Sequence, residues 1–176
     1  MKNSKFNTFS LAIILVIAKL YYALISGQII YEITNSIISE KYSVYNYIIS
    51  EYFKKGYYKP HPIAGYIFLI LFCLLNIYLI TKLLKANLLL KNYRVGSLLN
   101  LKQTKKIKSI GSGLIIYAKS WYTLHMISYF FYVDINTFFT ALPQFIVFYI
   151  LGKLMLFISA VAEEGTLHKQ ENDLTI

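Results

Sequence analysis

Long apolar stretches dominate the chain. Four of them reach the roughly 20 residues that an α-helix needs to cross the hydrocarbon core of a bilayer, and they cover residues 8–31, 63–84, 110–132 and 137–161. The pattern predicts an all-α integral membrane protein, in which residues 1–176 form one domain built as a bundle of four transmembrane helices.

The first stretch follows Lys2 and Lys5, as the apolar part of a secretory signal follows basic residues. Lys19 interrupts the stretch, however, and no cleavage site with small residues comes after it. We therefore expect a retained membrane span rather than a cleaved signal.

The polar segments between the stretches differ in charge. Residues 82–108 contain eight Lys or Arg side chains and no Asp or Glu, whereas the four lysines of residues 32–62 are accompanied by three glutamates. Basic residues collect in the loops that stay in the cytoplasm. We therefore predict a basic inner loop over residues 85–109, an outer loop over residues 32–62, a cytoplasmic tail over residues 162–176, and both termini in the cytoplasm. Within the inner loop we expect a helical extension of the second span, a turn near Gly96 and Ser97, and a basic segment that leads into the third span.

Within the outer loop, apolar and aromatic residues recur at three- and four-residue spacing between Tyr45 and Phe53. This spacing predicts a short amphipathic helix. Tyrosine favours the boundary between membrane and water, because its ring is apolar and its hydroxyl is polar. We expect this helix to lie flat on the outer surface of the membrane.

The composition agrees with a membrane protein. Hydrophobic residues make up 57% of the chain and charged residues 15%, against roughly 25% charged residues in soluble domains. The net charge of +10 is explained by the lysines of the inner loop, so it is not evidence for nucleic-acid binding. The single cysteine, Cys73, lies in an apolar run, where it has no disulfide partner and no cationic neighbour to activate it.

The predicted spans carry the lysines Lys19, Lys119 and Lys153, although a lysine at the bilayer centre costs about 2.5–3.5 kcal/mol on insertion scales. No Asp or Glu lies within a span to neutralise them. The third span has the fewest strongly apolar residues and is marginal by itself, so we expect it to insert against its neighbours. At helical spacing, Lys119 shares one stripe with Tyr122 and His125.

Three interpretations of these lysines are open. In the first, they converge at a similar depth on an anion-binding pocket, for instance for a lipid phosphate. In the second, each stem reaches toward the inner headgroups and carries its ammonium group out of the hydrocarbon. In the third, the lysines are deprotonated or the span boundaries are displaced. The polar cluster expected from the first interpretation contains Lys19, Asn76, Lys119, Tyr122, His125 and Lys153.

The chain has no recognisable catalytic motif. His61, His125 and His168 lie far apart without the spacing of a zinc-binding helix, and there is no glycine-rich phosphate loop and no nucleophile elbow. We predict a protein that is not an enzyme and that holds no metal and no cofactor. The basic run from Lys102 to Lys108 favours binding of anionic lipids at the inner face over direct binding of nucleic acid.

The end of the chain has a specific pattern. The chain leaves the last span through a glycine and a leucine, and it closes with a glutamate, a polar residue and the sequence Asp-Leu-Thr before a final aliphatic residue. These residues are Gly165, Leu167, Glu171, Asn172, Asp173, Leu174, Thr175 and Ile176. Together with the four-span plan, the long first outer loop and the Ile110-Gly111 step into the third span, this ending resembles the bacterial membrane protein family catalogued as domain of unknown function 2975.

The resemblance implies a multi-pass protein of the bacterial cytoplasmic (inner) membrane, and it assigns no catalytic residue. Members of the family are often encoded beside small helix-turn-helix regulators. We therefore expect an accessory or regulatory protein whose inner loop and tail dock a soluble regulator, with the C-terminus adding as a strand or binding in a backbone nest. For the tail, the alternative is that Glu171 and Asp173 fold back onto the inner-loop lysines. The alternative function is a small carrier or anionic-lipid-binding protein that uses Lys19, Lys119 and Lys153.

Overall fold

Four long helices make up the described part of the chain. The computed structural model describes residues 2–38, 62–91, 101–132 and 135–174. The helices are α1 (Lys2–Ile38), α3 (Pro62–Lys91), α4 (Leu101–Tyr132) and α5 (Ile135–Leu174), and these four ranges contain no strand. The predicted all-α architecture is confirmed.

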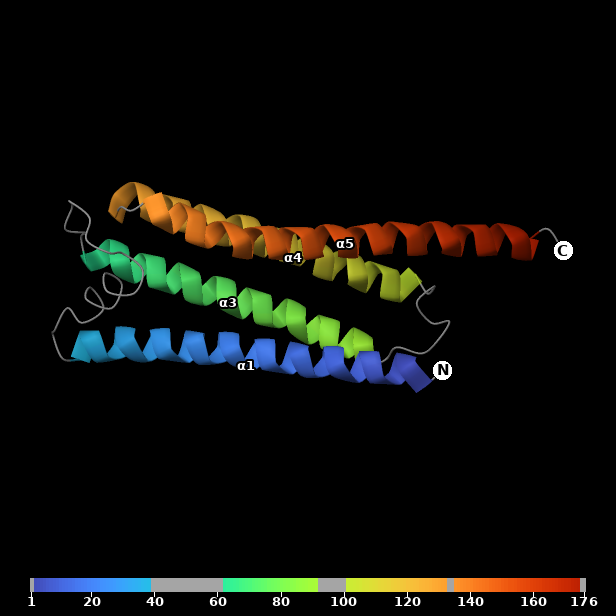
Figure 1. Cartoon of the computed structure of the whole chain (residues 1–176), viewed down its shortest axis with the longest axis horizontal. Coiled ribbons are helices and arrows are strands. Elements are labelled where there is room, and N and C mark those ends of the chain that lie inside the picture. The colour runs from blue at the N-terminus through green and yellow to red at the C-terminus, as the bar shows by residue number, and fades with distance from the viewer. Residues whose placement is uncertain (1, 39–61, 92–100, 133–134, 175–176) are drawn as a thin grey trace.

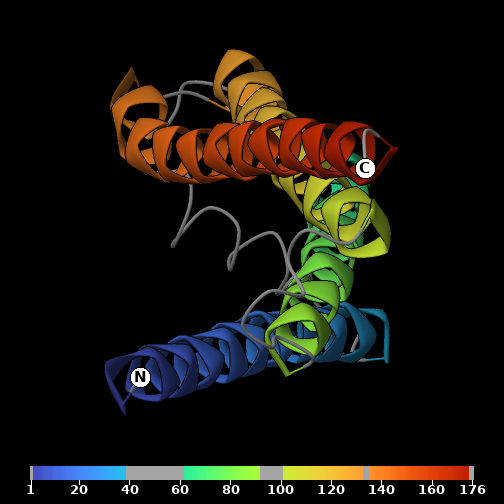
Figure 2. The same cartoon turned by 90° about the vertical axis from the view of Figure 1, so that its right-hand side faces the viewer.

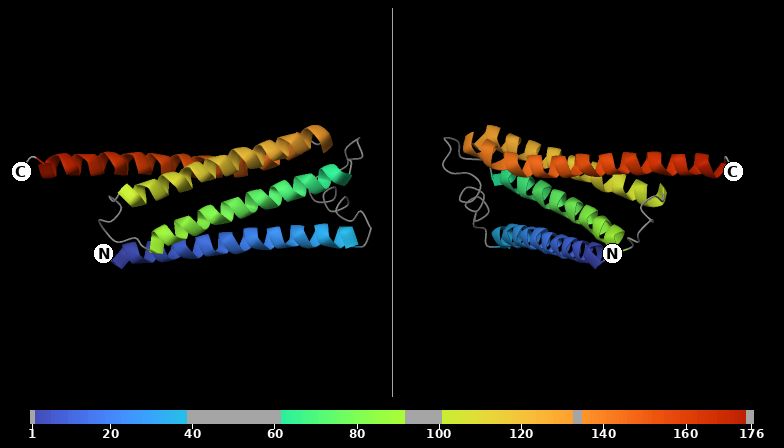
Figure 3. Two further views of the ribbon diagram at one scale, coloured as in Figure 1. Left: turned by 180° about the vertical axis from the view of Figure 1, so that it is seen from behind. Right: turned by 45° about the vertical axis from the view of Figure 1, so that its right-hand side comes forward.

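The helices run up and down in a row. α1, α3 and α4 lie beside one another in chain order, and α5 lies along α4 (Figures 1 and 3). Among the described helices, the backbone of α1 packs against α3 alone and that of α5 against α4 alone, so the row stays open, as Figure 2 shows from one end. Successive helices are antiparallel, which places the start of α1 and the end of α5 at the same end of the molecule (Figure 1). The side of the membrane on which this end lies stays a prediction.

Three of the helices are long and apolar enough to cross a bilayer. Their apolar spans are Phe9–Asn35 in α1, Gly65–Leu90 in α3 and Ala141–Thr166 in α5. Bulky apolar side chains stay exposed on α1 and α5, among them Leu24 and Phe157. Soluble monomers rarely expose apolar surface on this scale, whereas lipid covers it in a membrane protein.

The helix α4 does not meet the same criterion among the described residues. Its first eight residues include four lysines, and Lys119 and His125 follow deeper in the helix. This result agrees with the expectation that the third predicted stretch is marginal by itself. The crossing of the membrane by α4 stays a prediction.

The predicted inner loop is largely helical. α3 covers residues 85–91 and α4 covers residues 101–109, so only the middle of the predicted loop 85–109 lies outside a described helix. Lysine, leucine and glutamine are good helix formers, and neither helical segment contains a proline to end the helix. The six lysines of residues 85–109 are therefore carried on two facing helices, whereas Arg94 lies outside the described residues.

The predicted starts of the outer loop and of the tail also lie within helices that continue beyond them. α1 continues to Ile38, beyond the predicted start of the outer loop at residue 32, and α5 continues to Leu174 through most of the predicted tail 162–176. A tail that is helical through Leu174 does not present that residue as an added strand. The amphipathic helix predicted between Tyr45 and Phe53 lies outside the described residues.

The helices α4 and α5 approach each other closely through small residues. A Cβ atom at Gly152 would lie 2.8 Å from the carbonyl oxygen of Gly111, and one at Gly111 would lie 2.9 Å from the carbonyl oxygen of Gly152. Small residues at seven-residue spacing let two antiparallel backbones stay close over several turns. The buried small residues are Thr104, Gly111 and Ala118 on α4 and Gly152, Ser159 and Thr166 on α5, and the Ser159 hydroxyl donates to the Thr104 carbonyl over 3.2 Å.

The side chain of Tyr22 connects α1 to α4 and α5. Its ring lies edge-on to Tyr117 of α4, with 6.3 Å between ring centroids, and to Phe148 of α5 at 6.5 Å. The side-chain amide of Gln144 on α5 donates to the Tyr22 hydroxyl over 3.4 Å. Tyr117 has no exposed surface. The packing of aromatic rings around it therefore brings α1, α4 and α5 together at one level.

Candidate functional site

The three lysines of the predicted polar cluster lie on three different helices. Lys119 on α4 and Lys153 on α5 are exposed, and Lys19 on α1 is half-buried. The ammonium group of Lys153 lies 5.7 Å from the centroid of the Tyr149 ring, one helical turn away on the same helix. The Lys153 ammonium group thus lies toward the predicted outer end of α5. The second interpretation, in which each stem reaches toward the inner headgroups, stays a prediction.

The remaining members of the predicted cluster lie inside or at the edge of the bundle. Asn76 on α3 and His125 on α4 are buried, and Tyr122 is half-buried against the ring of Phe145, at 4.9 Å between centroids. The predicted stripe on α4 is therefore split, because Lys119 faces outward while His125 faces inward.

His125 is held by its own helix. Its Nδ1 atom lies 2.9 Å from the carbonyl oxygen of Trp121, and its ring lies 3.9 Å from the Trp121 ring, centroid to centroid. On the α3 side, the rings of Phe68 and Phe72 lie edge-on to it at 6.2 and 6.1 Å. These contacts describe a histidine packed in an aromatic environment.

The structure brings a different set of lysines together, at the end of the bundle where α3 ends and α4 begins. Here a cavity of about 320 Å³ lies between the two helices. We call this cavity the basic recess, and its lining residues are Lys85 and Leu88 of α3 and Lys105, Lys106 and Ser109 of α4.

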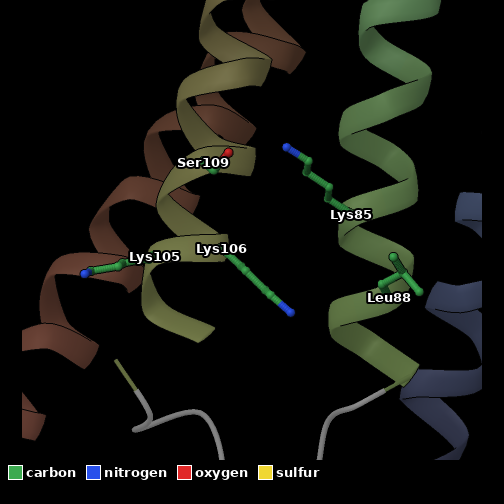
Figure 4. Close-up of a pocket in the computed structure, with 5 residues that line it drawn as sticks. All are labelled: Lys85, Leu88, Lys105, Lys106 and Ser109. Atoms are coloured by element: carbon green, nitrogen blue, oxygen red, sulfur yellow. The ribbon is translucent and has the colours of Figure 1, made fainter. Parts of the chain in front are cut away.

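The side chains of the basic recess point in different directions (Figure 4). Lys85 extends from α3 toward Ser109 on α4, and Lys106 extends from α4 into the space below them, whereas Lys105 points away from it. Two ammonium groups and one hydroxyl thus face a common space from two helices. These groups are hydrogen-bond donors, and two of them carry a positive charge, which suits the oxygen atoms of an anion.

Lys82 continues the basic surface one turn farther along α3. Its carbon stem lies against Gly113 of α4, because a Cβ atom at Gly113 would lie 2.6 Å from two of the stem carbons. Its ammonium group lies 4.9 Å from the centroid of the Tyr78 ring, a distance at which a cation is attracted to the face of an aromatic ring. The glycine is therefore what allows this lysine to lie between the two helices.

Sequence reasoning predicts the helical extension of the second span but counts Lys85, Lys105 and Lys106 only as charges of the inner segment, and so it misses the basic recess. The signal is present in the sequence, because the three-residue spacing from Lys82 to Lys85 continues α3 without a helix-ending residue. Finding the recess also requires knowing that α4 begins early enough to face this end of α3.

Two further expectations concern metals and the cysteine. The described residues contain no group of three or more His, Cys, Asp or Glu side chains placed to hold a metal ion. Cys73 is buried in α3 as a free thiol. His61 lies outside the described residues, and the side chain of His168 is not described either.

Comparison with known proteins adds no relative. The chain matches no protein-family model, no curated protein and no solved structure. The resemblance of the C-terminal segment to the bacterial family therefore stays a prediction.

Proposed function

We propose that this protein is a multi-pass protein of the bacterial cytoplasmic membrane that binds the headgroups of anionic lipids in the basic recess. The observation that carries the proposal is the pair Lys85 and Lys106, which face one cavity of about 320 Å³ from two different helices. The proposed role is binding and not catalysis. Binding of anionic lipids is the alternative function predicted from the sequence, but the lysines proposed to bind them are now Lys85 and Lys106.

The depth of the basic recess supports a lipid headgroup as the ligand. Lys85 lies five residues before Leu90, where the apolar span of α3 ends, so the recess is close to the boundary between hydrocarbon and headgroups. No Asp or Glu occurs between Lys82 and Lys108. The predicted orientation places this end of the bundle in the cytoplasm, where anionic lipids attract basic residues by about 1 kcal/mol each.

The first test removes the two lysines that face the cavity. Substituting Lys85→Gln and Lys106→Gln together should weaken binding of phosphatidylglycerol by about 2 kcal/mol, which is about thirtyfold in Kd. Native mass spectrometry of the detergent-solubilised protein measures the number of bound lipids as phosphatidylglycerol or phosphatidylcholine is added. Binding of phosphatidylcholine, which has no net charge, should be weak and unchanged.

The matched control changes the total charge by the same amount. Lys108 and Lys119 are exposed and do not line the recess, so Lys108→Gln with Lys119→Gln should leave phosphatidylglycerol binding close to that of the unmodified protein. An equal loss in both double variants would show that net charge alone attracts the lipid, and the proposal of a site would then be wrong.

A second candidate is the docking of a soluble regulator, and one observation favours it. α5 continues as a helix through Leu174 and extends beyond the start of α4 (Figure 1). A helix that projects from a membrane bundle offers a face to a groove in a partner protein. The predicted fold-back of Glu171 and Asp173 onto the inner-loop lysines gains no support from this path of the backbone.

The two candidates respond differently to truncation. A photo-crosslinker placed at Glu163, which is exposed on α5, should capture a soluble protein in native membranes. Deleting residues 169–176 should abolish this capture, because it removes the end of the projecting helix, while lipid binding in the basic recess stays unchanged. Crosslinks to lipid alone would contradict the regulator hypothesis and leave the lipid proposal standing.

A further inference from the structure

Three polar side chains, one on α3 and two on α4, are buried in the bundle away from the basic recess. Asn76 and Tyr117 are 0% exposed, and Trp121 is 6% exposed. Four of their polar atoms have no hydrogen-bond partner within 3.5 Å among the described residues, namely Nδ2 and Oδ1 of Asn76, the hydroxyl oxygen of Tyr117 and Nε1 of Trp121. The Tyr117 hydroxyl interacts at longer range with Tyr22 and Gln144. Buried polar atoms are nearly always hydrogen-bonded in folded proteins, so four such atoms in one region call for a binding partner.

The three side chains lie at one level of the bundle. The stem of Lys82 on α3 lies against Gly113 on α4, and the ring of Phe72 on α3 lies 6.1 Å from the ring of His125 on α4. The two helices are antiparallel (Figure 1). On α3, Asn76 lies between Phe72 and Lys82. The segment of α4 that lies beside this part of α3 runs from Gly113 to His125, and it contains both Tyr117 and Trp121.

The other two helices enclose this level. The ring of Phe148 on α5 lies 5.0 Å from the Tyr117 ring, centroid to centroid, and the ring of Tyr22 on α1 lies at 6.3 Å. Tyr22 also accepts a hydrogen bond from the Gln144 amide of α5 over 3.4 Å. The Tyr117 ring is thus packed against residues of α1 and α5.

The chemistry of the three groups defines the ligand class. The Asn76 amide and the Tyr117 hydroxyl each donate and accept hydrogen bonds, and the Trp121 indole only donates. None of the three carries a charge, and the nearest lysine on α4, Lys119, is exposed. On α3, the ammonium group of Lys82 lies over the Tyr78 ring at 4.9 Å from its centroid. A buried ion would therefore lack a counter-charge, which is strongly unfavourable. A small neutral molecule with both donors and acceptors fits.

We propose that Asn76, Tyr117 and Trp121 form an internal binding site for water or for a small neutral amide or alcohol. We call it the buried polar site. The buried polar site is independent of lipid binding in the basic recess, because Asn76 lies nine residues before Lys85 on α3. This spacing is about 13 Å at a helical rise of 1.5 Å per residue.

The sequence supplies a direct reporter, since Trp121 is the only tryptophan in the chain. The full chain is reconstituted in phosphatidylcholine nanodiscs, and the fluorescence of Trp121 is recorded with increasing acrylamide, a small neutral amide that quenches on contact, and separately with iodide. We expect quenching by acrylamide and none by iodide. Asn76→Leu should lower the quenching constant about two- to tenfold, the effect of losing one hydrogen bond.

Asn87→Leu is the matched control, because Asn87 is the same residue type on the same helix and is only half-buried, three turns away. It should leave the quenching constant unchanged. Tyr117→Phe removes a single hydroxyl and keeps the ring, so it provides a second variant of the site should Asn76→Leu lower the helical content measured by circular dichroism.

The outcomes separate the two ligand sources. Quenching that Asn76→Leu reduces and Asn87→Leu does not supports binding of a neutral solute. Absence of quenching, combined with an emission maximum that moves to shorter wavelength in Asn76→Leu alone, supports a site that takes only water. Equal quenching by acrylamide and iodide, or identical spectra and quenching in all variants, would overturn the proposal.

Discussion

Replacing Gly152 with leucine is expected to separate α4 from α5 and to lower the free energy of unfolding by about 3 kcal/mol, the upper part of the range for overpacked interiors. The first carbon of the new side chain would already lie 2.6 Å from a side-chain carbon of Ile115 and 2.8 Å from the carbonyl oxygen of Gly111. A backbone oxygen has no alternative rotamer, so the helices themselves must move apart. Unfolding in mixed micelles by increasing sodium dodecyl sulfate, followed by circular dichroism, measures the change.

Gly27 offers the matched control for this substitution. It lies in α1, and a Cβ atom built there meets nothing within 4 Å. Gly27→Leu should therefore keep the stability of the protein or raise it by up to about 1 kcal/mol, because glycine is a poor helix former. Unfolding of Gly152→Leu at the same detergent fraction as the unmodified protein would show that α4 and α5 are not in close contact.

The second large effect concerns the insertion of α4. Placed alone between two reporter domains in a host membrane protein, residues 101–132 should insert in only a minority of molecules, whereas residues 62–91 should insert in most. The eight strongly apolar residues between 110 and 132 favour membrane insertion by about 2–5 kcal/mol, and Lys119 opposes insertion by about 2.5–3.5 kcal/mol. Glycosylation of an acceptor site after the segment reports whether it has crossed the membrane.

The presence of α1 and α3 ahead of it should restore insertion of α4. Its buried side, which includes Ile110, Tyr117 and Trp121, packs against α3 and its neighbours, and polar residues that face a bundle avoid the hydrocarbon. A reporter fused after residue 134 behind α1 and α3 should therefore be translocated in most molecules. Equal insertion of the α4 and α3 segments in isolation would contradict the assignment of α4 as a helix that depends on its partners.

The length of the apolar runs is enough to predict the helices. The predicted spans 8–31, 63–84 and 137–161 each overlap an apolar span of the structure, and the structural spans extend four to six residues farther at their C-terminal ends. The ends are harder to predict because lysine and glutamate, which mark a loop by polarity, also propagate a helix. Polarity therefore locates the membrane boundary, and it does not locate the end of the helix.

The candidate site is harder to predict than the fold. Lys119 and Lys153 stand out in the sequence because charges in apolar runs are costly, but their side chains are exposed. The direction of a side chain depends on which neighbours its helix meets, and hydrophobic periodicity is weak in helices that are apolar on every side. Lys85 and Lys106 come together only because α3 and α4 are antiparallel and both extend into the segment predicted as a loop. Asn76 is the one predicted cluster member whose described side chain is fully buried.

The open row of helices has a consequence for how the protein is made. α1 leaves the ribosome first, and among the described helices its backbone contacts α3 alone. The closest helix pair, α4 with α5, is synthesised last, and chains assemble in the order in which their parts emerge. The first helix must therefore remain in lipid until α3, its only backbone neighbour among the described helices, has been synthesised. The contact between α4 and α5 forms as translation ends.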